Sequence, residues 1–149
     1  MRVTLSLRGD YAVRAMLALA EHTAAMEPGA ESEAGAPKLL SAGQIAERMR
    51  IPARFVAHVL ADLRRAGLVI GSTGRSGGYR LALPPAEIDL LRIVDAAEPH
   101  EGAPRCVVRG IPCDPAGRCA VHDAFGGATA ALRGELAQRS LAGLVSHPD

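Results

Sequence analysis

The spacing of apolar residues predicts an amphipathic helix over residues 8–22. Its apolar face repeats at i, i+3, i+4 and i+7 and consists of Val13, Met16, Leu17 and Ala20. Asp10 suits the N-cap of this helix, because a carboxylate there can accept a hydrogen bond from a free backbone amide. The stretch that follows is poor in bulky apolar residues and rich in Gly, Pro and Glu. We therefore expect a flexible loop over residues 23–40.

Two short helices are predicted next. The motif Ser41-Ala-Gly-Gln44 has the form of a capping box, in which the hydroxyl and the amide side chain each satisfy a backbone amide at the start of a helix. Pro52 suits the first position of the second helix, and Gly67 suits the residue after its C-cap. The apolar face of this second helix consists of Phe55, Val56, Val59, Leu60 and Leu63.

A β-hairpin is predicted after the second helix. Residues 68–70 and 79–83 form its two strands, the glycine-rich segment 71–78 forms its tip, and two prolines stop the second strand. A helix-turn-helix followed by a hairpin is the plan of a winged helix. We therefore expect the second helix to enter the major groove of double-stranded DNA and the hairpin tip to lie along the backbone or in the minor groove.

Two further helices are predicted, over residues 87–97 and 122–140. The apolar side of the last one consists of Phe125, Ala128, Leu132 and Leu136. The expected fold class is therefore mainly α with a small β-hairpin wing. The 149 residues suffice for one core, and the scarcity of aromatic residues, with no Trp, favours helices.

The chain lacks the features of a membrane or secreted protein. No stretch approaches the roughly 20 consecutive apolar residues of a membrane span, and the first ten residues contain no apolar run of the secretory kind. We expect a cytoplasmic protein with no membrane partner.

Positive charge is concentrated in the predicted DNA-binding part. The net charge is only +1, but the segment 48–80 contains seven arginines against a single acid, Asp62. Arg54 and His58 project from the second helix on the side away from its apolar face, where they could reach bases or phosphates. Across the helices and the wing, the candidate DNA-binding residues are Ser41, Gln44, Arg54, His58, Ser72, Thr73, Arg75, Gly77 and Gly78.

Three cysteines and a histidine form a second candidate site. Cys106, Cys113, Cys119 and His122 have the spacing C-x6-C-x5-C-x2-H. An odd number of cysteines in a chain expected to be cytoplasmic favours a metal, a cluster or a reactive thiol over a disulfide framework. The short C-x2-4-C knuckle of most zinc sites is absent. An iron-sulfur cluster, a zinc ion and plain reactive thiols all remain open at this point.

The sequence resembles the IscR/NsrR/RirA family of winged-helix regulators over nearly the whole chain. The resemblance is carried by residues 7–17 (LRGDYAVRAML), 41–47 (SAGQIAE), 55–69 (FVAHVLADLRRAGLV) and 77–82 (GGYRLA), and it extends through the cysteine segment and the last helix. The sequence departs from the family at Thr73, where an Arg often precedes the first glycine of the wing, and in the length of the loop over 23–40. These departures concern which DNA site is read.

The resemblance implies an iron-sulfur cluster on Cys106, Cys113 and Cys119. His122 matches the histidine that the iron-sulfur biogenesis regulators supply as fourth ligand, which would fit a 2Fe-2S cluster. Asp10 matches the carboxylate that the nitric-oxide-sensing members supply from the partner chain, which would fit a 4Fe-4S cluster. We favour His122 and 2Fe-2S. Each residue also has a structural alternative, as the start of the last helix and as an N-cap.

These observations predict a homodimeric transcription regulator, and a repressor rather than an activator, that reads a pseudo-palindromic operator and senses redox state, nitric oxide or iron supply through its cluster. The expected parts are a winged helix-turn-helix domain over 1–98, a cluster-binding loop over 99–121 and a dimerisation helix over 122–142. No nucleophile elbow or Walker-type loop is present, so we do not expect an enzyme. The alternatives are a thiol- or zinc-based regulator of the same fold, an electron-transfer or cluster-carrier protein and, more remotely, a redox enzyme.

Overall fold

The computed structural model describes residues 4–25, 39–98, 110–111 and 120–146. In chain order its elements are α1 (Leu7–Ala24), α2 (Ala42–Met49), α3 (Ala53–Arg65), β1 (Val69–Ser72), β2 (Gly78–Leu81), the 3-10 helix η1 (Pro85–Glu87), α4 (Leu90–Ala97), α5 (Ala120–Ala137) and α6 (Leu141–Val145). The predicted fold class, mainly α with a small hairpin, is confirmed.

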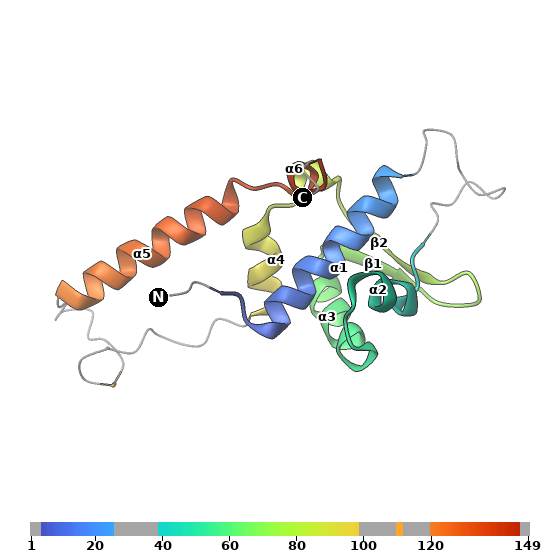
Figure 1. Cartoon of the computed structure of the whole chain (residues 1–149), viewed down its shortest axis with the longest axis horizontal. Coiled ribbons are helices and arrows are strands. Elements are labelled where there is room, and N and C mark those ends of the chain that lie inside the picture. Colours follow the sequence, from blue (N-terminus) through green and yellow to red (C-terminus); the bar gives the residue numbers. More distant parts are fainter. Residues whose placement is uncertain (1–3, 26–38, 99–109, 112–119, 147–149) are drawn as a thin grey trace.

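Helix α1 is the central element of the core. It packs against α2, α3, α4, α6 and the strand β2 (Figure 1). Its buried positions include Met16 and Leu19, and these meet apolar side chains from the surrounding elements, among them Ile45, Leu60, Leu63, Leu68, Ile88, Ile93 and Leu141. Burial of such aliphatic side chains is the main favourable term in folding.

The start of α1 corrects one prediction. The N-cap is Ser6, whose hydroxyl accepts a hydrogen bond from the amide of Gly9 at 3.1 Å. Asp10 lies inside the first turn and pairs with Arg14 at 2.8 Å, four residues on. The expectation that Asp10 is the N-cap is therefore wrong, because the hydroxyl four positions earlier already occupies that role.

The helix-turn-helix forms as predicted. The side chains of Ser41 and Gln44 make the reciprocal bonds of a capping box, with N–O distances of 3.2 and 2.9 Å. Pro52 lies one position before α3 and not inside it. Gly67 follows the end of α3 with a φ of +72°, a left-handed backbone that glycine adopts without strain.

The hairpin is antiparallel, with Val69 opposite Leu81 and Ser72 opposite Gly78. Leu40 forms an isolated antiparallel β-bridge with Tyr79 beside the hairpin, because the amide and carbonyl groups of the two residues exchange hydrogen bonds at 3.1 and 2.7 Å. A Cβ on Gly78 would lie 2.6 Å from the Leu40 carbonyl oxygen. Gly78 is therefore required for this close backbone approach.

The last helices differ from the prediction in their bounds. Residue 87 belongs to η1, and α4 begins only at Leu90, because the Asp89 carboxylate caps it through the amide of Arg92 at 2.9 Å. Helix α5 ends at Ala137, and a separate helix, α6, is capped by Ser140. Helix α6 was not expected. Its five residues are too few to show a helical repeat.

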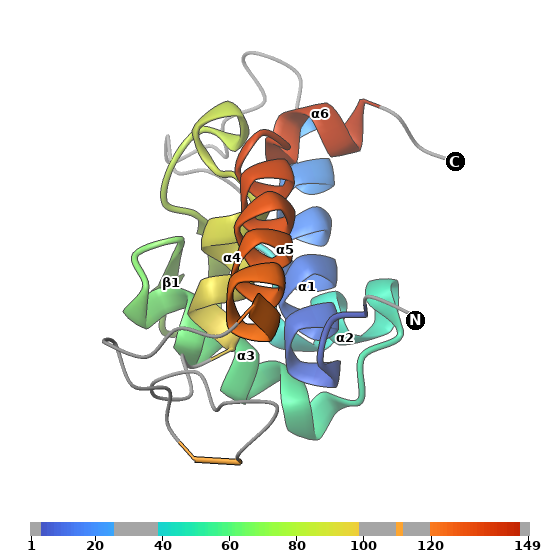
Figure 2. The same cartoon turned by 90° about the vertical axis from the view of Figure 1, so that its left-hand side faces the viewer.

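Helix α5 extends from the end of the molecule opposite the hairpin (Figure 1). Figure 2, viewed from that end, shows α5 in front of α4 and α1. Two hydrogen bonds between Arg133 and Asp95, at 2.9 and 2.8 Å, hold α5 against α4. This pairing raises the pKa of the Arg133 guanidinium above its ordinary value, first through the hydrogen bond and then through the charge of Asp95.

Candidate nucleic-acid interface

The outer face of α3 presents the two side chains that the sequence nominated for contact with DNA. Val56, Val59, Leu60 and Leu63 turn inward, whereas Arg54 and His58 are exposed. The Arg54 guanidinium carbon lies 4.8 Å from the centre of the Phe55 ring, and that ring is 5.6 Å from the ring of Tyr11 on α1. Arg54 therefore makes a cation–π contact with Phe55, whose ring packs in turn against Tyr11.

The hairpin tip exposes a second set of polar groups. Ser72, Thr73, Arg75 and Ser76 are all exposed. Gly74 has a φ of +106°, which a residue with a side chain rarely adopts. A Cβ on Gly77 would lie 2.5 Å from the carbonyl oxygen of Ser72. The two glycines therefore shape the tip that carries Arg75.

Three of the nominated residues have structural roles of their own. Ser41 and Gln44 are exposed, but their side chains form the capping box of α2. Gly78 is buried against Leu40. Their contact with DNA stays a prediction, as does that of the exposed residues.

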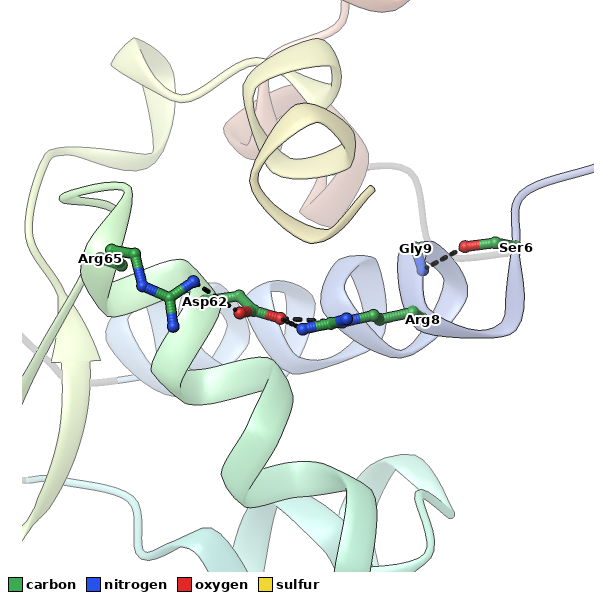
Figure 3. A network of polar contacts seen from close by, with 5 residues as sticks. All are labelled: Ser6, Arg8, Gly9, Asp62 and Arg65. Atoms are coloured by element: carbon green, nitrogen blue, oxygen red, sulfur yellow. Dashed lines mark hydrogen bonds and ion pairs between the residues drawn. The ribbon is translucent and has the colours of Figure 1, made fainter. Parts of the chain in front are cut away.

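The single acid of the arginine-rich segment does not lie on this face. Asp62 is 4% exposed and belongs to the inner side of α3. Its carboxylate accepts hydrogen bonds from Arg8 on α1 and from Arg65 on α3 (Figure 3). The outer face is therefore left with a surplus of positive charge, of the kind that phosphate backbones attract. Sequence reasoning missed this buried acid, although an isolated Asp between buried Leu60 and Leu63 was a signal.

A shallow groove lies beside the exposed face of α3. It has a volume of about 320 Å³ and is bounded by Leu7, Arg8, Tyr11, Phe55, His58 and Val59. His58 and Phe55 thus border both the groove and the outer face, so the first turn of α1 lies next to the candidate recognition surface.

The second candidate site lies largely outside the described residues. Cys106, Cys113 and Cys119 fall within the segments 99–109 and 112–119, as does most of the predicted cluster-binding loop, and the predicted flexible loop falls mainly within 26–38. His122 lies in the first turn of α5 and is partly buried, and Asp10 pairs with Arg14. Among the described residues, no three His, Cys, Asp or Glu side chains gather closely enough to hold a metal ion.

A membrane span requires a helix that is both long and apolar. Within the described part of the chain, no helix combines the length and the apolar character that a span needs.

The fold and the exposed basic face define a winged helix-turn-helix protein. The sequence comparisons narrow this class further. The chain belongs to the Rrf2 family, whose model, described as an iron-dependent transcriptional regulator, matches residues 5–147. This confirms the family resemblance that the sequence motifs indicated.

Relatives of this family are named as transcriptional regulators. A helix-turn-helix-type regulator of Neisseria meningitidis is 36% identical over 119 residues, which cover 80% of this chain and 72% of the relative. An rrf2-like regulator of Rhodobacter capsulatus is 35% identical over 106 residues, 70% of this chain and 65% of the relative. The regulator IscR of Aliivibrio salmonicida is 33% identical, covering 79% of this chain and 62% of the relative. The chain thus spans about two thirds of the length of these relatives. Their names confirm the expectation of a regulator and not an enzyme.

Solved structures show the same fold. IscR of T. potens superimposes with a TM-score of 0.72 at 24% identity and covers 97% of this chain and 87% of its own. CymR of B. subtilis, described as the global cysteine regulator, superimposes with a TM-score of 0.72 at 22% identity, covering 99% of this chain and all of its own. At this level of identity the likeness establishes the architecture alone.

Proposed function

We propose that this chain binds double-stranded DNA in the cytoplasm as a homodimeric transcription regulator, most simply a repressor, with α3 in the major groove and the hairpin tip on the backbone. The observation that supports this most directly is the placement of Arg54 and His58 on the outer face of α3, next to a hairpin that exposes Arg75 at its tip. Recognition helices contact base edges with residues near their N-terminal ends. Arg54 is the second residue of α3, where such a contact is made.

The exposed polar groups have different tasks in this proposal. A guanidinium such as that of Arg54 can donate two hydrogen bonds to the O6 and N7 atoms of guanine. Arg75 and the hydroxyls of Ser72 and Thr73 suit phosphate oxygens, which fix the register of a protein on the duplex without reading its sequence. The neutralisation of Asp62 inside the molecule supports the proposal, because an exposed carboxylate on this face would repel phosphates.

Helix α5 supports the homodimer. None of its 18 residues is buried within the described part of the chain, and the large apolar side chains of Phe125 and Leu132 are 54% and 41% exposed. Large apolar side chains that recur on one side of an exposed helix indicate a partner surface. Pairing of two α5 helices would set two copies of α3 about one DNA turn apart, which is the spacing of a pseudo-palindromic operator.

The cysteine segment is the proposed sensor. Thiolates are soft ligands that suit the irons of an iron-sulfur cluster, and the description of the family as iron-dependent agrees with this choice. Cys106, Cys113 and Cys119 would supply three ligands. A bound cluster would add a redox-active group whose loss removes a constraint on the segment that joins α4 to α5.

Two described residues remain candidates for the fourth ligand. His122 lies in the first turn of α5, three positions after Cys119, and its imidazole would suit a 2Fe-2S cluster. The carboxylate of Asp10 is 37% exposed and pairs with Arg14. Service as a ligand to the partner's cluster would require Asp10 to exchange its ion pair with Arg14 for iron. We retain His122 as the favoured ligand, because it lies only three positions after Cys119 in the same chain.

The DNA proposal is tested by selecting duplexes from a random-sequence library with the parent protein and mapping the protected bases by footprinting. We expect two protected half-sites related by a two-fold axis, with centres about 10 base pairs apart or a multiple of this. Failure to enrich any duplex would contradict the proposal and revive a carrier or electron-transfer role.

The sensor proposal is tested by purification without oxygen, with an absorbance spectrum and counts of iron and acid-labile sulfide. We expect sulfur-to-iron absorbance that is lost when any of the three cysteines is replaced by Ala. His122→Ala and Asp10→Ala separate the fourth-ligand candidates, since only the true ligand alters the spectrum or lifetime of the cluster. One zinc per chain without sulfide, or neither metal nor sulfide, would establish instead a zinc- or thiol-based regulator.

A further inference from the structure

An ion pair between the buried carboxylate of Asp62 and the half-exposed side chain of Arg8 joins α3 to the first turn of α1. The Asp62 carboxylate is 4% exposed, and its Oδ2 atom accepts a hydrogen bond from the Nε of Arg8 at 2.9 Å and a second one from the same guanidinium. Its Oδ1 atom accepts a hydrogen bond from Arg65 at 3.0 Å, within α3 (Figure 3). The contact with Arg8 joins two helices, because Arg8 lies 54 positions away in the sequence. The contact with Arg65 stays within α3, because Arg65 lies only three positions away.

The interhelical contact is directional. A carboxylate removed from water is costly unless its lone pairs are satisfied, so removal of the arginine that faces Asp62 would leave its buried charge undercompensated. Two N–H groups of the Arg8 guanidinium converge on the one Oδ2 atom of Asp62, so the contact limits how far the two side chains can move apart. The pair therefore constrains the rotation of α3 about its own axis relative to α1.

The same turn of α1 is also held from its other side. The amide of Ser6 donates a hydrogen bond to Oε1 of Glu98 at 2.8 Å. The Glu98 carboxylate also packs closely against Gly9, since a Cβ on Gly9 would lie 2.6 Å from Oε1 of Glu98. Glu98 follows directly on α4, so the first turn of α1 is connected to the ends of two other helices.

We propose that Asp62 is a positioning residue for DNA recognition, which sets the orientation of α3 by clamping it to the first turn of α1 through Arg8. This inference rests on the proposed function, in which α3 is the recognition helix. Asp62 and Arg54 are eight residues apart on one rigid helix, about 12 Å along its axis. A small rotation of α3 at Asp62 therefore moves Arg54 and His58 relative to the base edges that they read.

The test compares three single variants and one double variant. Arg8→Gln and Asp62→Asn both break the interhelical contact, but they change the net charge in opposite directions. Arg65→Gln is the matched control, because it makes the same charge change as Arg8→Gln and breaks only the contact within α3. Binding of each protein is measured against a duplex enriched by the parent and against the same duplex with its sequence scrambled, at several salt concentrations.

We expect Arg8→Gln and Asp62→Asn each to lower the ratio of affinities for the enriched and scrambled duplexes by about 3- to 30-fold. The double variant, Arg8→Gln with Asp62→Asn, should show no greater fall in this ratio than either single variant, because each of the three proteins lacks the same interhelical contact. Arg65→Gln should stay close to the parent. The salt dependence should be unchanged in Arg8→Gln, since Arg8 does not contact a phosphate in this proposal.

Three results would overturn the proposal. The first is a change in affinity that follows the change in net charge, so that Asp62→Asn binds both duplexes more tightly and Arg8→Gln binds both more weakly. The second is an equal loss in Arg65→Gln. The third is a fall of about 0.9 in the salt slope of Arg8→Gln, which would make Arg8 a direct phosphate contact.

Amide hydrogen exchange tests the contact between Arg8 and Asp62 in the absence of DNA. Exchange in α3 should accelerate in Arg8→Gln and Asp62→Asn and not in Arg65→Gln, and an unchanged rate in the first two would overturn the clamp. If the parent fails to distinguish the two duplexes, the proposed function fails, and the exchange measurement still decides whether the clamp exists.

Discussion

At the scale of single residues, the exposed and buried charges of the arginine-rich segment have separate tasks. Arg54 rests on the Phe55 ring with its guanidinium exposed, whereas Asp62 is buried under Arg8 and Arg65. Surface arginines are often merely solvated. Here the single acid of the segment 48–80 is buried on the inner side of α3, so it does not lie beside Arg54 and His58 on the outer face.

Arg54→Ala and Arg75→Ala should each weaken binding to an enriched duplex while leaving the dimer intact. If Arg54 reads a guanine, its loss costs about 1 to 3 kcal/mol and relaxes specificity at one base pair. If Arg75 holds a phosphate, its loss weakens binding to all duplexes and lowers the salt slope by about one. Fluorescence anisotropy titrations at several salt concentrations measure both quantities. Unchanged affinity in both variants would remove α3 and the wing from the interface.

At the scale of elements, sequence patterns predicted those structures that depend on neighbouring residues. The capping box at Ser41 and Gln44, the apolar face of α3 and the turn at Gly67 are local, and the structure has all of them. Helix α6 escaped prediction because it depends on tertiary contacts, such as the bond from the Leu141 amide to the Ile88 carbonyl at 2.7 Å. The burial of Asp62 escaped for the same reason, since its partner lies in another helix.

The candidate site was predicted unevenly for the same physical reason. The outer positions of α3 and the hairpin tip follow from periodicity and from glycine placement, so Arg54, His58 and Arg75 could be named in advance. The N-cap of α1 could not, because Ser6 and Asp10 both suit a cap and the backbone geometry decides between them.

The apolar side of α5 gives a prediction about assembly. Phe125→Glu should shift the protein from dimer to monomer, because it places a charge in the centre of the proposed contact between two α5 helices. Ala130→Glu is the control. It introduces the same side chain at an exposed position about half a helical turn away from Phe125 and Leu132. Light scattering after size-exclusion chromatography measures the mass. A variant Phe125→Glu that stays dimeric would place the dimer contact elsewhere.

At the scale of the whole molecule, a sensor acts only if it favours one DNA-binding geometry over another. A group held equally well in both geometries shifts nothing, however tightly it binds. The cysteine segment joins α4 to α5 along the chain. We propose that a change in it alters the dimer contact of α5 and, through the hydrogen bond between Ser6 and Glu98, the first turn of α1.

We therefore expect the anaerobically purified protein and the protein stripped of iron to differ about 5- to 150-fold in affinity for an enriched duplex at fixed salt. This range corresponds to a coupling of about 1 to 3 kcal/mol. Linkage is reciprocal, so the same duplex should change the affinity for the iron-containing group by the same factor. Equal duplex affinities of the two forms would leave the cysteine segment with a structural role only.

The central claim is that this winged helix reads DNA sequence, and one titration tests it most directly. The parent protein is titrated into an enriched duplex and its scrambled counterpart over a range of salt concentrations. The account predicts a preference of about 10³-fold or more for the enriched duplex, with affinity for both duplexes falling as salt rises. Equal affinity for the two duplexes, or no binding to either at low salt, would contradict it.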